Sequence, residues 1–127
     1  MKDDIKNKED IYKLVKYFYI KLMSDAEMHH FFIDFRNPKL LEEHLQVLVS
    51  FWDNMLFYSG GYRKNAMKPH MQLHQTKPFA NNHFKRWLSI FNSSIDDLFV
   101  GQTAQTAKEK ALSIATVMEI KISALNS

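Results

Sequence analysis

Apolar side chains recur every three to four residues along most of the chain, which is the spacing of an amphipathic helix. The pattern predicts a helix from Lys8 to Met23 and a second from Pro38 to the glycine pair at 60–61. Two further helices are predicted, one from Phe79 or Ala80 to Phe99 and one from about Thr103 to Leu125. No alternating pattern typical of a strand competes with them, so we expect an all-α fold.

Few residues interrupt these helices. The breakers are Pro38, Gly60, Gly61, Pro69, Pro78 and Gly101. Most of them fall in residues 60–78, which we expect to be a long irregular segment with a functional role. Ser24 and Glu27 have the spacing of a capping box, which predicts a short helix through Phe31 and Phe32. We expect one domain over residues 1–127, with residues 1–8 as a flexible N-terminal extension.

The composition excludes several classes of protein. The chain has 127 residues, with three glycines, three prolines and no cysteine. Disulfide scaffolds, cysteine-ligated zinc sites, iron–sulfur clusters and covalently attached haem all need cysteine. The first ten residues lack the apolar stretch of a signal peptide, and no window reaches the roughly 18 apolar residues of a membrane span. We therefore expect a soluble protein, in the cytoplasm by default.

Charge is unevenly distributed along the chain. The net charge is +3, from 17 basic and 14 acidic residues, but no acid occurs between Asp53 and Asp96. The basic residues of that stretch are Arg63, Lys64, Lys68, Lys77, Lys85 and Arg86. The stretch is either a solvated basic face or a site for an anionic ligand. Nucleic acid is disfavoured, because no run of four basic residues occurs.

Tyr19, His44 and Trp87 carry polar tips on the apolar faces of three different predicted helices. Each has an ordinary interpretation as a core residue whose polar atom reaches the surface, the backbone or a water. Together they indicate a shared polar site inside an apolar cavity. His70 and His74 lie in the irregular basic segment, as exposed loop residues or as a nonspecific pair of zinc ligands.

Five short motifs follow one another along the chain. They are Tyr17-Phe18-Tyr19, Phe31-Phe32, the run from His44 to Trp52, His70-Met71-Gln72-Leu73, and the run from His83 to Phe91. The last run, His–Phe–x–Arg–Trp–Leu–x–x–Phe, is the most distinctive. From about Ile11 to Leu125 the chain resembles the truncated haemoglobins. The absence of any glycine before Gly60 favours group III of that family.

The resemblance implies a globin-like, two-over-two helical sandwich around haem b. It assigns His70 as the proximal iron ligand, and Tyr19, His44 and Trp87 as the distal cluster. It implies a pocket lined by Phe32, Leu48, Phe51, Trp52 and Met118. Dioxygen becomes partly negative when bound, so distal donors stabilise it by roughly 1–3 kcal/mol.

Two points of the implied haem site stay open. Counted back from Phe79, either His70 or His74 aligns with the proximal ligand, and we favour His70 because His70-x-x-Leu73 matches the family pattern. We also hypothesise that at least one basic residue just before His70 pairs with a haem propionate. The candidates are Arg63, Lys64 and Lys68.

The leading interpretation is a haem-binding globin that reversibly binds dioxygen or another diatomic ligand. We expect a monomer served by an electron-donating reductase, with no nucleic-acid or membrane partner. The polar distal cluster favours slow oxygen release over bulk oxygen transport, and it can support dioxygenase-like nitric oxide chemistry or peroxidase-like activity. The alternative is a cofactor-free helical interaction domain that binds an anionic partner through residues 63–86.

Overall fold

The computed structural model describes residues 2–57 and 81–125, with the side chains of 81 and 122–125 excepted. Over these ranges the chain forms four α-helices and one 3₁₀-helix, and no described residue lies in a strand. The prediction of an all-α fold is confirmed. The segment predicted to be irregular, 60–78, lies outside the described residues.

The first helix, α1, spans Lys8–Ser24 and so ends one residue later than predicted. Asn7 caps its start, because the side-chain oxygen accepts a hydrogen bond from the backbone N–H of Asp10 at 3.0 Å. The apolar stripe of α1 is buried as its periodicity indicates. Its buried members are Ile11, Leu14, Val15, Phe18, Tyr19 and Leu22.

The short helix after α1 is η1, a 3₁₀-helix over His29–Arg36 that buries Phe31 and Phe32. The predicted capping box before it is wrong. The Ser24 hydroxyl donates back to the carbonyl of Ile20 at 2.9 Å, within the last turn of α1. The carboxylate of Asp25 instead accepts a hydrogen bond from the backbone N–H of Glu27 at 3.1 Å. Ser24 therefore ends one helix and does not begin the next.

Three long helices complete the described chain: α2 over Pro38–Phe57, α4 over Asn81–Leu98 and α5 over Gln102–Leu125. Pro38 occupies the first turn of α2, where its fixed φ suits a helix. The end of α4 and the start of α5 fall within one residue of their predicted positions. The predicted end of α2 and start of α4 lie outside the described residues. No helix of the described chain is both long and apolar enough to cross a membrane.

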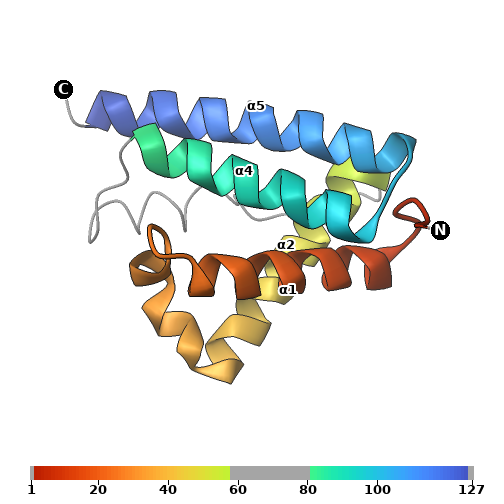
Figure 1. Ribbon diagram of the computed structural model, residues 1–127, viewed down its shortest axis with the longest axis horizontal. Helices are drawn as coiled ribbons and strands as arrows, with labels where there is room; N and C mark the ends of the chain where they lie inside the picture. Colours follow the sequence, from red (N-terminus) through yellow and green to blue (C-terminus); the bar gives the residue numbers. More distant parts are fainter. Residues whose placement is uncertain (1, 58–80, 126–127) are drawn as a thin grey trace.

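The helices pack as two pairs, α1 with α2 and α4 with α5. In Figure 1, α4 and α5 lie side by side along the top and α1 runs beneath them, with α2 crossing behind. The α1 helix also packs against α4, so the two pairs share one core. Small buried residues on α5 let α4 approach closely. They are Ala104, Ala107, Ala111 and Ala115. This is the predicted two-over-two sandwich.

The N-terminal residues lie against the end of α4 and the start of α5. Ile5 is only 2% exposed, and the carbonyl of Asp3 accepts a hydrogen bond from the N–H of Val100 at 3.0 Å. The carboxylate of Asp4 accepts hydrogen bonds from the N–H groups of Thr103 at 2.9 Å and Ala104 at 2.8 Å. The expectation of a flexible extension over residues 1–8 is therefore corrected for the part that is described, because Asp4 caps a helix about 100 residues away.

Candidate functional site

A tyrosine and a histidine meet in the interior of the molecule. The hydroxyl oxygen of Tyr19 on α1 lies 2.8 Å from Nε2 of His44 on α2. Tyr19 is only 1% exposed and His44 is half-buried. Burial raises the pKa of the Tyr19 hydroxyl well above its ordinary value, so it stays a neutral O–H donor across the physiological range. The structure thus brings together two of the three residues of the predicted distal cluster.

Two phenylalanines of η1 enclose this pair. The Tyr19 ring makes edge contacts with Phe32 and Phe35, at centroid distances of 5.5 and 5.9 Å. Phe35 also stacks on the imidazole of His44 at 4.7 Å, with 19° between the ring planes. Phe32 was predicted as a pocket wall, whereas Phe35 was not predicted. The segment is a 3₁₀-helix with non-helical backbone angles at Phe32. Its apolar residues therefore do not follow the 3.6-residue period of an α-helix, and that period could not identify Phe35.

Trp87 enters the same interior from α4. It is 5% exposed, and its ring contacts Phe18 edge-on at 5.5 Å and lies parallel to Phe91 at 5.8 Å. Phe18 in turn touches Tyr19 at 5.5 Å. The third predicted distal residue therefore shares an aromatic cluster with Tyr19, and the described contacts join the two through Phe18.

The predicted pocket walls lie on α2 and α5. Leu48 and Trp52 are buried on α2, Phe51 is half-buried beside Trp52, and Met118 on α5 is 1% exposed. Trp52 stacks on Phe91 at 5.1 Å, which links α2 to the aromatic cluster of α4. These walls are apolar.

Charge is kept away from this interior over the part of the chain that is described. The buried carboxylate there is Asp53, which pairs with Lys8 at 4.0 Å, at the opposite end of α1 from Tyr19. Apolar walls with a hydroxyl–imidazole pair between them fit haem and a small uncharged ligand. The remaining predicted haem contacts lie outside the described residues: His70, Arg63, Lys64 and Lys68, together with His74.

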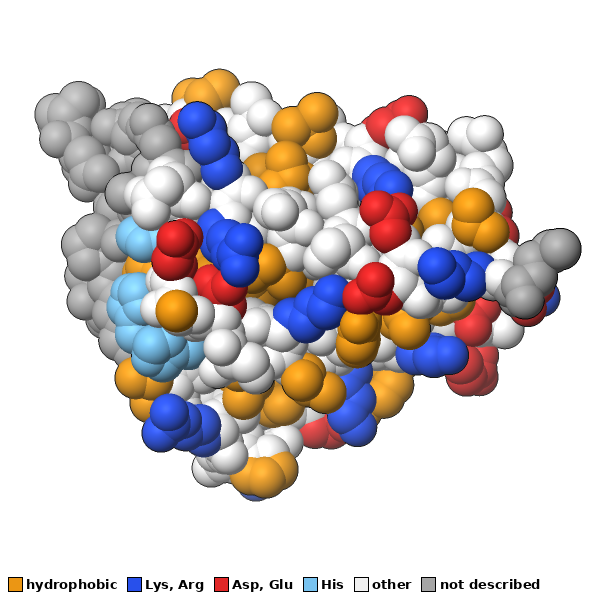
Figure 2. Space-filling view, in the orientation of Figure 1, with side chains coloured by type: hydrophobic (Ala, Val, Ile, Leu, Met, Phe, Trp, Pro, Cys, Tyr) orange, Lys and Arg blue, Asp and Glu red, His pale blue; other side chains and the backbone are white. Residues whose placement is uncertain are grey.

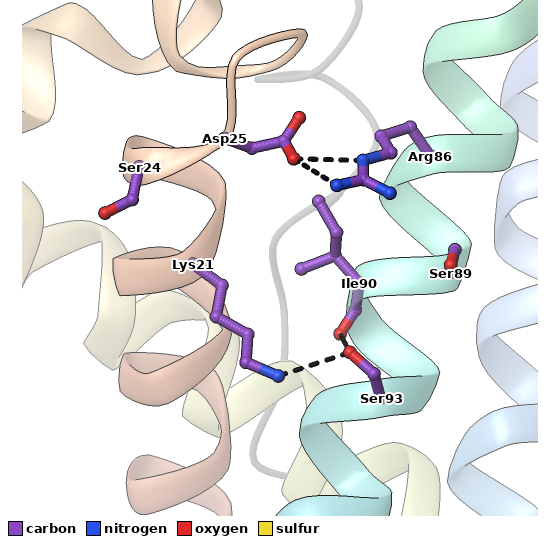
Figure 3. Close-up of a pocket in the computed structure, with 7 residues that line it drawn as sticks. All are labelled: Lys21, Ser24, Asp25, Arg86, Ser89, Ile90 and Ser93. Carbon is purple, nitrogen blue, oxygen red and sulfur yellow. Dashed lines mark hydrogen bonds and ion pairs between the residues drawn. The ribbon is translucent and has the colours of Figure 1, made fainter.

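Two polar ties hold α1 against α4, the helices that carry Tyr19 and Trp87. Arg86 donates from both Nε, at 2.9 Å, and a terminal nitrogen to one oxygen of Asp25, whose side chain is 8% exposed. Lys21 donates to Ser93 at 3.2 Å and to Asp97 at 2.8 Å. Figure 3 shows Asp25 with Arg86, and Lys21 with Ser93, along a surface pocket between the two helices. The pocket has a volume of about 340 Å³. None of the predicted distal residues lines this pocket.

Comparison with known proteins agrees with this architecture. The two-over-two helical sandwich with a buried tyrosine–histidine pair is the architecture of a truncated globin. The chain belongs to the bacterial-like globin family, whose sequence profile matches residues 2–123. Globins bind haem and diatomic ligands, so family membership gives this chain a haem-binding role.

Similar proteins place the chain within the family. It is 28% identical, over 118 residues and 91% of each chain, to the group 3 truncated hemoglobin ctb of Campylobacter jejuni. It also matches the crystal structure of group III truncated hemoglobin from Campylobacter jejuni with a TM-score of 0.83 and 27% identity. That match covers 96% of this chain and 95% of the solved one. The resemblance to group III truncated haemoglobins is thereby confirmed.

Proposed function

We propose that the protein binds haem b through His70 and holds a diatomic ligand, dioxygen foremost, beside Tyr19, His44 and Trp87. The observation that carries the proposal is the hydrogen bond between Tyr19 and His44 inside apolar walls. Buried polar groups are costly unless they are paired, so a hydroxyl and an imidazole at one core position are typical of a binding site. Membership of the globin family supports the choice of haem.

Tyr19 acts as the principal donor to the ligand. Haem, when bound, would supply the ferrous iron that binds a diatomic molecule such as dioxygen. The chain supplies a phenol O–H that burial keeps protonated, and this group would donate a hydrogen bond to the partly negative ligand. A hydrogen bond to a charged acceptor is worth about 1.5–3 kcal/mol, and about 1.4 kcal/mol is tenfold in affinity.

His44 determines where the Tyr19 hydroxyl points. When Nδ1 of His44 carries the ring proton, Nε2 accepts the Tyr19 O–H and the donor is engaged. When Nε2 carries the proton, it donates to the Tyr19 oxygen, and the O–H is directed to the ligand. The stacked ring of Phe35 holds the imidazole in place for either arrangement. His44 is thus a positioning residue for Tyr19.

Slow ligand release follows from this arrangement. Hydrogen bonds donated by Tyr19 and Trp87, together with the apolar walls, favour retention of the bound ligand. A role in bulk oxygen transport, which needs fast release, is therefore disfavoured. Retained dioxygen suits chemistry with nitric oxide, and a polar pocket suits peroxide. Oxidation of nitric oxide would require a reductase to regenerate ferrous haem, and peroxide turnover would require a reducing substrate, which is why we include an electron-donating partner such as a reductase.

A visible spectrum of the purified protein tests the proposal. We expect a Soret band that shifts on reduction and again with carbon monoxide, and a five-coordinate ferrous signature that His70→Ala abolishes. His74→Ala is the matched control and should leave that signature in place. If only His74→Ala removes it, the ligand assignment is wrong. A protein that folds as a helical domain and takes up no haem would favour the cofactor-free interaction domain.

A further inference from the structure

The surface pocket between α1 and α4 brings together polar groups that the proposed haem site does not use. Figure 3 shows Arg86 with Asp25 at one end of the pocket and Lys21 with Ser93 at the other. The side chain of Ile90 lies between these two pairs. Arg86 and Ser93 are 93 − 86 = 7 residues apart on one helix, so their backbones are separated by roughly 10 Å. The pocket therefore has a cation at each end and an apolar side chain between them.

Arg86 has hydrogen-bond donors that the fold does not use. A guanidinium carries five N–H groups. Those that reach Asp25 come from Nε and from one of the two terminal nitrogens. Within the described chain Arg86 makes no other hydrogen bond, and its side chain is 46% exposed. The second terminal nitrogen can therefore donate to a molecule in the pocket.

Ser89 adds another available donor. It follows Arg86 by one turn of α4, lines the same pocket and is exposed. Residues three apart on a helix are neighbours on its surface, so Ser89 and Arg86 can contact one molecule together. The Ser89 hydroxyl makes no hydrogen bond to another described residue. Ser93 differs, because its hydroxyl donates to the carbonyl of Ile90 at 3.1 Å and accepts from Lys21 at 3.2 Å.

The carboxylate of the pocket is already engaged. One oxygen of Asp25 accepts both hydrogen bonds from Arg86, and the other accepts from the backbone N–H of Glu27 at 3.1 Å. Burial alone would lower the pKa of the Lys21 ammonium group, but the hydrogen bond and the charge of Asp97 raise it, so Lys21 stays positive. The available groups are thus donors and a cation, which are complementary to a ligand that accepts hydrogen bonds.

The charge around the pocket is nearly balanced. In Figure 2, Lys and Arg side chains lie beside Asp and Glu side chains over the face that includes α1 and α4. Seven charged side chains line the pocket or adjoin those that do, and they sum to 4 − 3 = +1. They are Lys2, Lys21, Lys85, Arg86, Asp25, Glu27 and Asp97. The surroundings therefore do not repel an anion, and its affinity depends on short-range hydrogen bonds.

We propose that this pocket binds a small oxyanion, a carboxylate or a phosphate, between α1 and α4. Arg86 and Ser89 donate to its oxygens, and Lys21 supplies positive charge at the other end. Ile90 contacts the carbon atoms of an organic anion. The volume of about 340 Å³ is at the lower end of the range for small-molecule sites. Binding is measured without oxygen, so the result is independent of the proposed haem function.

Isothermal titration calorimetry tests the site on the protein as purified. The protein is dialysed into a buffer free of carboxylate and phosphate, and is titrated with citrate, with inorganic phosphate and with chloride. Ionic strength is held constant so that screening is the same throughout. We expect one citrate or phosphate per chain, with a dissociation constant on the order of 1 mM, and no saturable heat with chloride. The tighter of the two identifies the preferred oxyanion, and no saturable binding by either overturns the proposal.

Three single variants change the site in opposite directions. Lys21→Gln and Ser89→Ala each remove a contact, so each should weaken binding by about three- to tenfold. Asp25→Asn removes the negative charge that competes for Arg86, so it should strengthen binding by a similar factor. Binding elsewhere on the surface would not give this opposite response. Unchanged affinity in both Ser89→Ala and Asp25→Asn would overturn the proposal.

Lys85→Gln is the matched control for charge. Lys85 is the exposed neighbour of Arg86 and does not line the pocket, and its replacement removes the same single charge as Lys21→Gln. Equal weakening in these two variants would show a general effect of charge and no pocket. Ser89 is exposed, so Ser89→Ala keeps the test decisive if a variant of Asp25 or Lys21 fails to fold.

Discussion

Tyr19 places a single hydroxyl in the core, 2.8 Å from Nε2 of His44. Because phenylalanine keeps the ring and removes only this donor, Tyr19→Phe isolates its effect on the ligand. We expect oxygen dissociation to become about 10- to 100-fold faster, which corresponds to roughly 1.4–2.8 kcal/mol. Displacement of oxygen by carbon monoxide in a stopped-flow instrument measures the rate.

Tyr12 offers a matched control on the same helix. It is partly exposed, and its hydroxyl donates to Glu42 at 2.5 Å, at the surface. Tyr12→Phe removes a hydroxyl from α1 without touching the interior, so oxygen release should keep the rate of the unaltered protein. Equal release rates in Tyr19→Phe and the unaltered protein would show that Tyr19 is not the donor.

At the scale of single elements, Asp4 acts as a cap for α5. Burial by itself would raise the pKa of Asp4, but hydrogen bonds from the N–H groups of Thr103, Ala104 and Ile5 together lower it below its ordinary value. Asp4→Ala should cost about 0.5–2 kcal/mol of unfolding free energy at neutral pH, as measured by urea denaturation. A lowered pKa means that the carboxylate stabilises the fold above its unfolded pKa, so the difference should shrink as pH falls below about 4.

Asp3→Ala is the control for the cap, because its side chain is exposed and only the backbone carbonyl of Asp3 bonds to Val100.

Gly101 supplies a second test of the cap that Asp4 forms. Its φ is +145°, and a Cβ there would lie 2.4 Å from Cγ of Asp4. Gly101→Ala should displace the cap, so the double variant with Asp4→Ala should lose less than the sum of the single losses. Full additivity would contradict the capping role.

The polar contacts that hold α1 against α4 also belong to the scale of single elements. Arg86→Ala leaves the carboxylate of Asp25, whose side chain is 8% exposed, without its guanidinium. An unpaired buried charge is costly, so the urea midpoint should fall, and adding Asp25→Asn should recover part of the loss. Lys85→Ala changes the exposed neighbour of Arg86 and should have little effect. A double variant as unstable as the sum of both singles would argue against the tie.

At the scale of the whole molecule, the helices could be predicted because their information is local. The stripe of α1 repeats every three to four residues, and Gly101 marks the turn between α4 and α5 within the sequence itself. The same stripes place Tyr19, His44 and Trp87 inward. The local pattern of apolar residues does not show which side chains of different helices contact one another.

The features that sequence analysis missed are of that second kind. Asp4 caps a helix that begins about 100 residues later, and Arg86 reaches back to Asp25, 61 residues earlier. Phe35 was missed for a different reason, since the 3₁₀ geometry of η1 breaks the helical period. Contacts between distant residues depend on the packing of the whole chain, and short irregular helices carry no periodic signal.

Haem binding should couple the whole molecule to its cofactor. A ligand that binds only the folded state adds RT ln(1 + [L]/Kd) to stability, about 1.4 kcal/mol for each tenfold in affinity. We therefore expect the haem-loaded protein to unfold at a higher urea concentration than the haem-free chain.

We also expect neutralisation of at least one of Arg63, Lys64 and Lys68 to speed haem loss, because a haem propionate would lose its cationic partner. Transfer of haem to an acceptor protein, followed at the Soret band, measures the rate.

Lys13 provides the control for this measurement, as an exposed lysine on α1. Lys13→Gln lowers the net charge by the same single unit as Lys68→Gln. A general effect of charge would therefore change haem loss equally in both, whereas a propionate contact would change it only in the variant that breaks the contact. Unchanged haem loss in the variants of Arg63, Lys64 and Lys68 would leave the acid-free basic stretch as a solvated face. The stability of the holoprotein would then have to come from the proximal histidine and the apolar walls.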